Sequence, residues 1–394
     1  MEIVHRQDRS SLPIKMWLPD LADAPREQAI NCSQLPFAFK HIAIMPDSHK
    51  GFGLPIGGVM ATRDVVIPYA VGVDIGCGMI AVKTNIHRSD IKYDTELKLV
   101  LENIRRAIPV SHKSHDEPQD LCKMPLRAEL PLDGIVHQEF AKARTQLGTL
   151  GGGNHFIEIQ ADSHGYIWVM IHSGSRNLGH KVATHYDKVA QKLNASWHTK
   201  VPKKHKLAFL PLDSDEGQEY MREMKFCIEF AEANRALMMN RTLEALESAL
   251  CREVNQDIYI NKVHNEAVME HHFGENVMIH RKGATRARDN EYCIIPGSMG
   301  TFSYIGRGLG NPDSFHSCSH GAGRALSRTA AKEKISLEKT IASLDAKGII
   351  HGIRHQNDLE EAPDAYKDID KVMALQTDLV EVEYKLTPLA VVKG

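Results

Sequence analysis

Glycine-rich, motif-like segments recur from residue 46 to residue 324, and no Pro/Ser-rich or like-charged linker separates them. Domain boundaries usually fall in linkers of that composition. At roughly 150 residues per domain, a chain of this length could hold two or three domains. The unbroken spread of the motifs instead favours one large domain over residues 1–394.

Short apolar runs with β-branched residues predict strands along the whole chain. These runs are Ile42–Met45, Val65–Ile67, Met79–Lys83, Phe156–Ile159, Tyr166–Ile171, Val277–His280 and Tyr292–Ile295. Apolar residues at three- and four-residue spacing predict a long helix from about Glu219 to Ala249, and Ser336 is a suitable N-cap for another helix. Strands and helices mix without regular βαβ alternation, so we expect an α+β fold with mixed sheets.

The overall charge says little about partners. The formal net charge is −2, so only local basic stretches, such as Lys203–Lys206 and Arg281–Arg288, could meet the phosphates of RNA. Solvated basic faces would have the same composition. Charge alone leaves both interpretations open.

The cysteines indicate a reducing compartment. Seven cysteines are scattered without a paired framework, and no signal peptide opens the chain. No apolar run reaches the ~18 residues that a membrane span needs. We therefore expect a cytoplasmic protein with no membrane contact. Twenty-two histidines are many for this length, and they are the first chemical clue.

A carboxylate and a thiol stand three residues apart in the turn that contains Asp74 and Cys77, where flanking glycines allow tight folding. His155, His172 and His264 stand in similarly distinctive settings. These five side chains could hold one metal ion, or two if the thiolate bridges. The ligand mixture suits zinc, iron, cobalt or manganese. Taken singly, the same residues could be a buried thiol and hydrogen-bonded structural histidines.

The segment SCSHGAGR, residues 317–324, has the features of a phosphate-binding turn that carries a nucleophile. Its glycines let backbone N–H groups approach phosphate oxygens, and a neutral imidazole at His320 can attack phosphorus. Arg324 and Arg328 would share one face of a following helix and bind phosphates. A second small-residue turn, IPGSMGTFS, covers residues 295–303. The alternative is a glycine-rich turn with a capping histidine.

Strand parity adds a local prediction. If residues 154–158 are extended, Asn154, Phe156 and Glu158 face one side and His155 the other. An amide, an aromatic ring and a carboxylate suit a purine and its phosphate, whereas His155 would turn toward a metal. The alternative is a half-buried strand with an exposed glutamate.

These pieces together resemble the RtcB family of RNA ligases, in order and over nearly the whole chain. The matching segments are MPDSHKGFGLPIGG (45–58), AVGVDIGCGM (70–79), LGTLGGGNHFIE (147–158), HSGSR (172–176), HN (264–265), RKGA (281–284), PGSMG (296–300), SHGAGR (319–324), AYKDID (365–370) and VKG (392–394). Motifs of this length rarely arise by chance. The resemblance therefore carries more weight than any one motif.

The resemblance implies two Mn²⁺ ions bridged by Cys77. Asp74 and His155 would bind one ion, and His172 and His264 the other. His280 competes for the last position, but the family pattern puts the ligand at the His-Asn pair.

The resemblance also implies that His320 takes GMP from GTP, with Asp47 orienting its imidazole. Arg324 and Arg328 would bind phosphates of the nucleotide or of RNA. The implied guanylate contacts are Asn154, Phe156, Glu158, Asn265, Pro296, Gly297, Ser298, Met299, Ser303, Gly321, Ala322, Gly323 and Lys393.

The implied activity joins an RNA 3′-phosphate or 2′,3′-cyclic phosphate end to a 5′-hydroxyl end, in tRNA splicing or RNA repair. It passes through a histidine–GMP intermediate and an RNA–ppG end, and a helper protein could assist guanylylation. A two-metal phosphoesterase without a covalent step is the main alternative, and a non-catalytic RNA-binding protein is another. Residues 111–138 match no motif and are expected to be a variable RNA-contacting region. Phe52 and Leu54 depart from the family pattern in a variable loop, and Cys318 has no assigned role.

Overall fold

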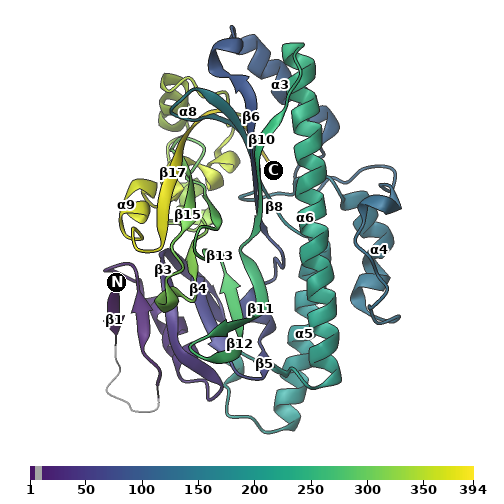
Figure 1. Ribbon diagram of the computed structural model, residues 1–394, viewed down its shortest axis with the longest axis vertical. Helices are drawn as coiled ribbons and strands as arrows, with labels where there is room; N and C mark the ends of the chain where they lie inside the picture. The colour runs from purple at the N-terminus through teal and green to yellow at the C-terminus, as the bar shows by residue number, and fades with distance from the viewer. Residues whose placement is uncertain (5–10) are drawn as a thin grey trace.

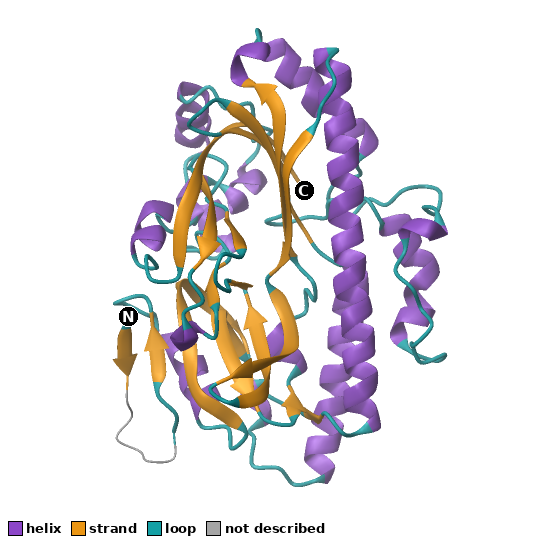
Figure 2. Cartoon of the chain, viewed as in Figure 1, coloured by secondary structure: helices purple, strands orange, loops and turns teal. Residues whose placement is uncertain are grey.

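Two β-sheets and one long helix organise the molecule, which is elongated along the direction of that helix (Figure 1). The computed structural model describes residues 1–4 and 11–394. Both sheets lie on one side of the long helix, and the remaining helices cover the other faces and ends (Figure 2).

The larger sheets contain six and seven strands. The six-stranded sheet has the order β1 (Glu2–Val4), β2 (Ile14–Met16), β3 (Ala38–Phe52), β4 (Leu54–Thr62), β12 (Glu275–Lys282) and β11 (Asn265–His272). The seven-stranded sheet has the order β10 (Gln256–Val263), β6 (Gly78–His87), β8 (Tyr166–Ser173), β7 (Phe156–Ala161), β17 (Val380–Lys393), β15 (Ser303–Gly308) and β14 (Tyr292–Ile295). Two small sheets pair β13 (Ala284–Arg286) with β16 (Ser317–Ser319) and β5 (Val65–Val66) with β9 (Leu210–Pro211).

The helices differ greatly in length. They are α1 (Asp23–Ser33), α2 (Pro68–Val71), α3 (Asp94–Ala107), α4 (Ile135–Gln146), α5 (Arg176–Ser196), α6 (Asp215–Leu250), α7 (Arg328–Lys334), α8 (Leu337–Ala346) and α9 (Ile369–Ala374). Short 3-10 turns are η1 (Arg88–Asp90), η2 (Leu121–Lys123), η3 (Lys203–His205), η4 (Pro312–Ser314), η5 (Gln356–Glu361) and η6 (Pro363–Ala365).

The prediction of an α+β fold is confirmed. Every predicted strand run lies in or overlaps a strand, namely β3, β5, β6, β7, β8, β12 or β14. The long predicted helix is α6, and the Ser336 hydroxyl caps α8 by accepting a hydrogen bond from the amide of Lys339. Within the two larger sheets, only the pair β2–β3 is parallel, and all other pairs are antiparallel. Strand β17 and helices α1 to α5 were not predicted.

Helix α6 forms the boundary between two parts of the core. Its first half carries Phe226 and Phe230, which pack with apolar residues of α5. Its second half carries Met238 and Leu246, which pack with α3 and with strands β6 and β8. The Ser214 hydroxyl caps its N-terminus, so the helix begins where the sequence supplies an acceptor for free amides.

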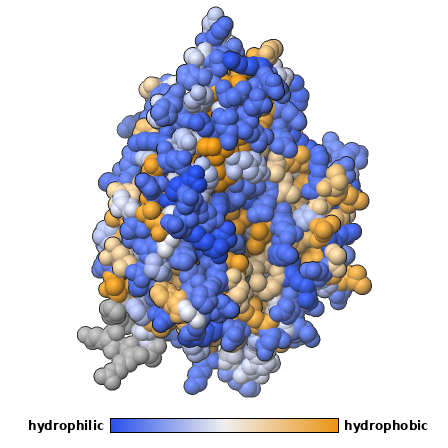
Figure 3. Space-filling view, in the orientation of Figure 1, coloured by the Kyte–Doolittle hydropathy of each residue, from blue (hydrophilic) through white to orange (hydrophobic). Residues whose placement is uncertain are grey.

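The predicted region 111–138, which extends into the first turn of α4, is fixed at its start and exposed further along. The Arg241 side chain on α6 donates to Gln119 at 2.6 Å and contacts the His115 imidazole at 2.9 Å. Leu126 and Leu132 are almost fully exposed. Figure 3 shows apolar side chains at the edge of the molecule where Figure 1 places α4. No helix among the described residues is both long enough and apolar enough to cross a membrane.

Truncating the buried face of α6 should destabilise the fold. Phe230 is fully buried, so Phe230→Ala should lower the free energy of unfolding by about 3–5 kcal/mol. Lys225→Ala on the exposed side of the same helix should change it by less than about 0.5 kcal/mol. Urea unfolding followed by circular dichroism measures both values. Equal effects would show that α6 does not carry the core in this way.

Candidate metal centre and nucleotide pocket

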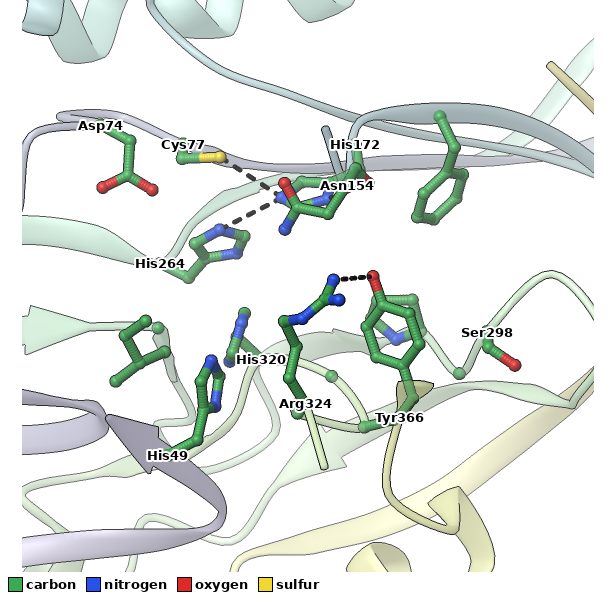
Figure 4. A pocket seen from close by; sticks show the side chains of 18 of the residues that line it. His49, Asp74, Cys77, Asn154, His172, His264, Ser298, His320, Arg324 and Tyr366 are labelled. Atoms are coloured by element: carbon green, nitrogen blue, oxygen red, sulfur yellow. Dashed lines mark hydrogen bonds between the residues drawn. The ribbon is translucent and has the colours of Figure 1, made fainter. Parts of the chain in front are cut away.

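One pocket lies where the ends of the two large sheets meet, and it gathers most of the residues that the sequence singled out (Figure 4). Its walls come from β3 and β4 of one sheet, from β7, β8 and β17 of the other, and from the turns after β12 and β14. The residues that line it are His49, Ile56, Asp74, Cys77, Asn154, Phe156, Glu158, His172, His264, Asn265, Lys282, Gly283, Pro296, Gly297, Ser298, Met299, His320, Gly321, Ala322, Gly323, Arg324, Tyr366 and Lys393.

A thiol and imidazoles converge on one side of this pocket. One ligand atom each from Cys77, His172 and His264 lies within 4.8 Å of the others, and all three residues are buried. The His172 Nε2 atom is 3.3 Å from the Cys77 sulfur and 3.4 Å from the His264 Nε2 atom (Figure 4). The His155 Nε2 atom lies 3.5 Å from the same sulfur. Asp74 lies on the pocket wall, close enough to Cys77 to raise the pKa of its thiol, but neither Asp74 nor His155 belongs to the three-residue group, and His155 does not line the pocket.

Backbone hydrogen bonds hold the thiol and one imidazole in register. The Cys77 amide donates to the Asp74 carbonyl at 2.9 Å, which closes the turn. The His264 amide donates to the Cys77 carbonyl at 2.9 Å, which fixes residues far apart in the sequence. Gly78 is required here because a Cβ atom would lie 2.1 Å from the carbonyl oxygen of Lys262. The glycine therefore serves the close approach of β6 to β10 beside the ligands.

The hydrogen bonds of two imidazoles leave their lone pairs facing the thiol. The His172 Nδ1 atom is 3.2 Å from the carbonyl oxygen of Asn154, and the His155 Nδ1 atom is 2.8 Å from that of Leu150. A carbonyl only accepts, so each Nδ1 carries the proton and each Nε2 presents a lone pair toward Cys77. Metal-binding histidines are oriented by carbonyl acceptors in this way. These donors therefore fit a bound metal ion.

Burial keeps the imidazoles neutral, which is the form that binds metals. Burial lowers the pKa of His155 to about 4 and lowers the pKa values of His172 and His264 well below the ordinary value. Burial also raises the pKa of the Cys77 thiol, so a metal ion must displace its proton.

Two neighbouring residues of α6, which sequence reasoning missed, tie the ligand-bearing turns together. The fully buried Arg235 guanidinium donates to the carbonyls of Gly76 and Ser173 at 2.9 and 3.0 Å. The Asn234 amide accepts from the amide of Thr149 and donates to its carbonyl. In the sequence both residues look like ordinary polar positions of a long helix, so no local signal could have identified them.

Metal binding should require Cys77 and should weaken as the pH falls. Because the thiol must lose its proton, protons compete with the metal, and affinity should drop below neutral pH. Addition of Co²⁺ should produce a thiolate-to-metal absorption band. Cys77→Ser should lack this band, whereas Cys251→Ser, at an exposed thiol beyond the end of α6, should keep it. A band that survives in Cys77→Ser would place the metal elsewhere.

His320 stands opposite the thiol cluster, with its ring fixed by one carboxylate. The Asp47 Oδ2 atom accepts from the His320 Nδ1 atom at 2.6 Å and from the His320 amide at 3.1 Å. Burial acts to raise the pKa of Asp47, but the adjacent His320 and Lys367 lower it overall, so this carboxylate is ionised. Gly323 has φ +72°, and a Cβ atom there would lie 2.0 Å from the Asp47 carbonyl oxygen. Gly323 thus allows the turn after His320 to pack closely against the Asp47 backbone, which keeps Asp47 and His320 together.

The tautomer of His320 follows from this contact. With the proton on Nδ1, the Nε2 atom presents a lone pair to the pocket. The ring centroid of His264 lies only 4.8 Å from that of His320. A phosphorus atom bound at His320 would therefore lie beside the thiol and imidazole cluster.

The predicted guanylate contacts, apart from Ser303, line this pocket. Ser303 lies behind the wall, where its hydroxyl accepts from the Gly297 amide at 3.2 Å and from the Gln160 side chain at 3.1 Å. Burial raises the pKa of Glu158 to about 7, although the nearby Lys393 acts against this rise. As the alternation predicts, Asn154, Phe156 and Glu158 line the pocket and His155 turns toward Cys77. Asn154 itself, however, lies in a turn before β7 and not in an extended strand.

The prediction that Arg324 and Arg328 share a helix face is wrong. Arg324 forms a β-bridge with Tyr366, and α7 begins only at Arg328. The reason is that residues 324–326 pair with Ala365 and Tyr366, and Ser327 caps α7, so the helix begins only after this extended segment. The two arginines still converge, because both approach the Oε1 atom of Glu361, at 3.1 and 3.6 Å. Arg324 lines the pocket and Arg328 is largely exposed.

His280 and Cys318 lie outside the pocket lining. The buried His280 ring accepts a hydrogen bond from the amide of Ile67 at 3.0 Å, so it has a structural partner. Cys318 is buried in β16. The pocket also contains His49, Lys282 and Tyr366, which sequence reasoning did not select although each stands in a matching motif.

Comparison with known proteins identifies the class to which this fold and site belong. The family model described as "tRNA-splicing ligase RtcB" matches residues 28–394. The chain is 40% identical to the RNA-splicing ligase RtcB of Escherichia coli K12, with 97% of each chain covered. It is 32% identical to the tRNA-splicing ligase RtcB of Nanoarchaeum equitans, with 99% of this chain and 97% of the relative covered.

The relatives are thus ligases whose names refer to RNA or tRNA splicing. A third, the tRNA-splicing ligase RtcB of Thermococcus kodakarensis, is 31% identical over 94% of this chain and 91% of its own length. The chain belongs to the RtcB family, and the resemblance read from its motifs is confirmed.

Proposed function

We propose that this protein is a GTP-dependent RNA ligase that stores GMP on His320. The observation that carries the proposal is the His320 Nε2 lone pair. The contact with Asp47 fixes its tautomer, and it faces the same pocket as the thiol and imidazole cluster. The natural setting would be tRNA splicing or RNA repair in the cytoplasm, with RNA as the partner and a helper protein as an additional one.

The reaction would proceed in three steps, each a nucleophilic displacement at phosphorus. The His320 Nε2 atom attacks the α-phosphorus of GTP, a P–N bond forms, and pyrophosphate leaves. An oxygen of the RNA 3′-phosphate then attacks the same phosphorus, the P–N bond breaks, and an RNA–ppG end results. Finally, the 5′-hydroxyl oxygen of the second RNA end attacks the 3′-phosphorus, loses its proton, and releases GMP. A cyclic phosphate end would first be hydrolysed to the 3′-phosphate.

The side chains of the pocket suit these steps. Phe156, Glu158 and Lys393 would receive the guanine base, since Lys393 Nζ lies 5.1 Å from the Phe156 ring centroid and near the buried carboxylate. Arg324 supplies a cation for phosphates. Asp74, Cys77, His155, His172 and His264 would hold two Mn²⁺ ions, which would neutralise charge on the phosphates.

The chain as a whole fits one catalytic unit over residues 1–394, and we propose that residues 111–138 contact RNA. A two-metal phosphoesterase is the alternative, because the metal cluster alone would serve it. The fixed tautomer of His320 favours the ligase, since hydrolysis has no need of that residue. A non-catalytic RNA-binding protein would need neither group.

Labelling with GTP tests the nucleophile. Protein incubated with Mn²⁺ and GTP labelled at the α-phosphate should retain acid-labile label after denaturation. His320→Ala should abolish labelling, and Asp47→Asn should reduce it because the tautomer is no longer fixed. His271→Ala, at an exposed histidine, should label like the wild type. Equal labelling of His320→Ala would overturn the assignment, and no labelling of the wild type would favour the phosphoesterase.

The pH dependence of nucleotide binding tests the role of Glu158. Burial raises its pKa to about 7, so the carboxyl group is neutral below that pH and ionised above it. Only the ionised form accepts hydrogen bonds from guanine N–H groups with both oxygens. The ratio of wild-type to Glu158→Gln affinity for GTP should therefore rise as the pH increases through about 7. Calorimetry at several pH values measures this ratio, and a constant ratio would contradict the role.

A further inference from the structure

An exposed phenylalanine stands at the tip of the β3–β4 hairpin. Phe52 is 66% exposed, and Gly53 makes the turn with φ +70°. Within the described part of the chain, its ring has no aromatic or cationic partner. A large apolar ring left in solvent in this way requires an explanation, because the hairpin could end in any polar residue.

The position of this ring is fixed. The Gln28 side chain donates to the Gly51 carbonyl at 2.6 Å and accepts from the Gly51 amide at 3.1 Å. The Lys282 ammonium donates to the carbonyls of Phe52 and Tyr69. The tip of the hairpin is therefore tied to α1 on one side and to the pocket wall on the other. Phe52 is therefore exposed on a backbone that hydrogen bonds hold in place.

The same hairpin forms part of the pocket mouth. His49, three residues before Phe52, lines the pocket, and so does Lys282, which holds the Phe52 carbonyl. The tip lies on the metal side of the pocket, because Lys282 is close to Asp74. The residues suited to guanine, such as Glu158, come from the other sheet. Through Lys282, the hairpin tip is thus connected to the side of the pocket that holds Asp74.

Lysines lie on the hairpin that carries Phe52 and on the segment that packs against its turn. Lys50 is exposed on the hairpin itself. The segment of η3 packs against the turn, since a Cβ atom on Gly53 would lie 2.6 Å from the Lys206 carbonyl oxygen. Its side chains Lys203 and Lys204 are exposed, and the Lys206 ammonium lies 5.9 Å from the Tyr69 ring centroid. Asp187 on α5 is buried, whereas Glu27 on α1 is exposed and lies close to His205, so three exposed lysines (Lys50, Lys203 and Lys204) stand near this turn together with one exposed carboxylate.

A second phenylalanine shows that hairpin tips in this fold need not expose a ring in this way. Phe273 is 44% exposed at the β11–β12 turn, but its ring lies 6.0 and 6.3 Å from the rings of Phe315 and Phe39. It lines no part of the pocket. Phe273 is therefore a matched control for Phe52.

We propose that Phe52, with Lys50, Lys204 and Lys206, forms a platform that binds single-stranded RNA beside its reacting end. An unpaired base would stack on the Phe52 ring, and the lysines would contact the adjoining phosphates. An aromatic ring among cations is how proteins hold single strands without reading their sequence. The assignment of RNA as the strand rests on the proposed function. The Phe52 platform adds to it the route by which the RNA end enters.

Substitution of the ring tests stacking directly. A short fluorescent single-stranded RNA with a 5′-hydroxyl end is titrated with each variant, and anisotropy gives the Kd. Phe52→Leu keeps apolar bulk and the backbone contact with Lys282 but removes the aromatic face, and it should weaken binding roughly tenfold. Phe52→Trp should bind at least as tightly as the wild type. Phe273→Leu should leave the Kd unchanged.

Salt dependence tests the lysines separately. Lys50→Gln and Lys204→Gln should each reduce the slope of log K against log salt by about 0.7, the value for one phosphate contact on a single strand. Lys98→Gln makes the same charge change on α3, at the far end of the molecule from the hairpin, and should leave the slope unchanged (Figure 1).

The platform and the ligase can fail independently. If Phe52→Leu and Lys50→Gln bind RNA like the wild type while GTP labels His320, the platform is wrong and the ligase stands. If the wild type takes no label from GTP but Phe52→Leu still loses RNA affinity, the platform stands without the ligase. A loss of affinity in Phe273→Leu equal to that in Phe52→Leu would also overturn the platform, because it would reflect general exposure of rings.

Discussion

The buried guanidinium of Arg235 is the interaction on which the rest of the site depends. It lies in the middle of α6 with no exposed surface, and its hydrogen bonds end on the carbonyls beside Cys77 and His172. A buried cation is costly when its donors lack acceptors. The two carbonyls accept from Nη1 and the Asn261 side chain accepts from Nε, whereas Nη2 has no hydrogen-bond partner among the described residues, so the turns that present these acceptors offset part of the cost. The thiol also lies close enough to this charge for it to lower the thiol's pKa, against the effect of burial. One helix thus sets both the positions and the electrostatics of the ligands.

The two sheets contribute different chemistry to the pocket. The seven-stranded sheet supplies imidazoles whose lone pairs face a thiol, together with the carboxylate and ammonium groups suited to a base. The six-stranded sheet supplies Asp47, which fixes the ring of His320, and the hairpin that carries Phe52. Because the pocket lies where these sheets meet, neither sheet holds a complete site. The packing of one sheet against the other is therefore a condition for chemistry, beyond its contribution to stability.

The sequence predicted the strands that carry functional residues, because these are short apolar runs that end in glycine-rich turns. The motifs also singled out the five candidate ligands and His320, and the family resemblance then gave them roles, although spacing alone cannot show that His264 approaches Cys77. The sequence did not reveal Arg235, which looks like any polar residue of a long helix. It also misplaced Arg324, because the pairing of residues 324–326 with the distant Ala365 and Tyr366 is invisible to a periodicity argument. Local patterns predict elements, whereas close approaches between distant segments need the fold.

The contact between Gly323 and the Asp47 carbonyl has a consequence for the order of events. His320 makes two hydrogen bonds to one carboxylate oxygen of Asp47, and Gly323 in the following turn packs against the Asp47 backbone. These contacts hold the His320 ring in one position. In the proposed reaction, the guanylate would stay at one position, and each reactant would have to bind next to it. Pyrophosphate would then have to leave before the RNA 3′-phosphate binds, so the two substrates would use the site one after the other.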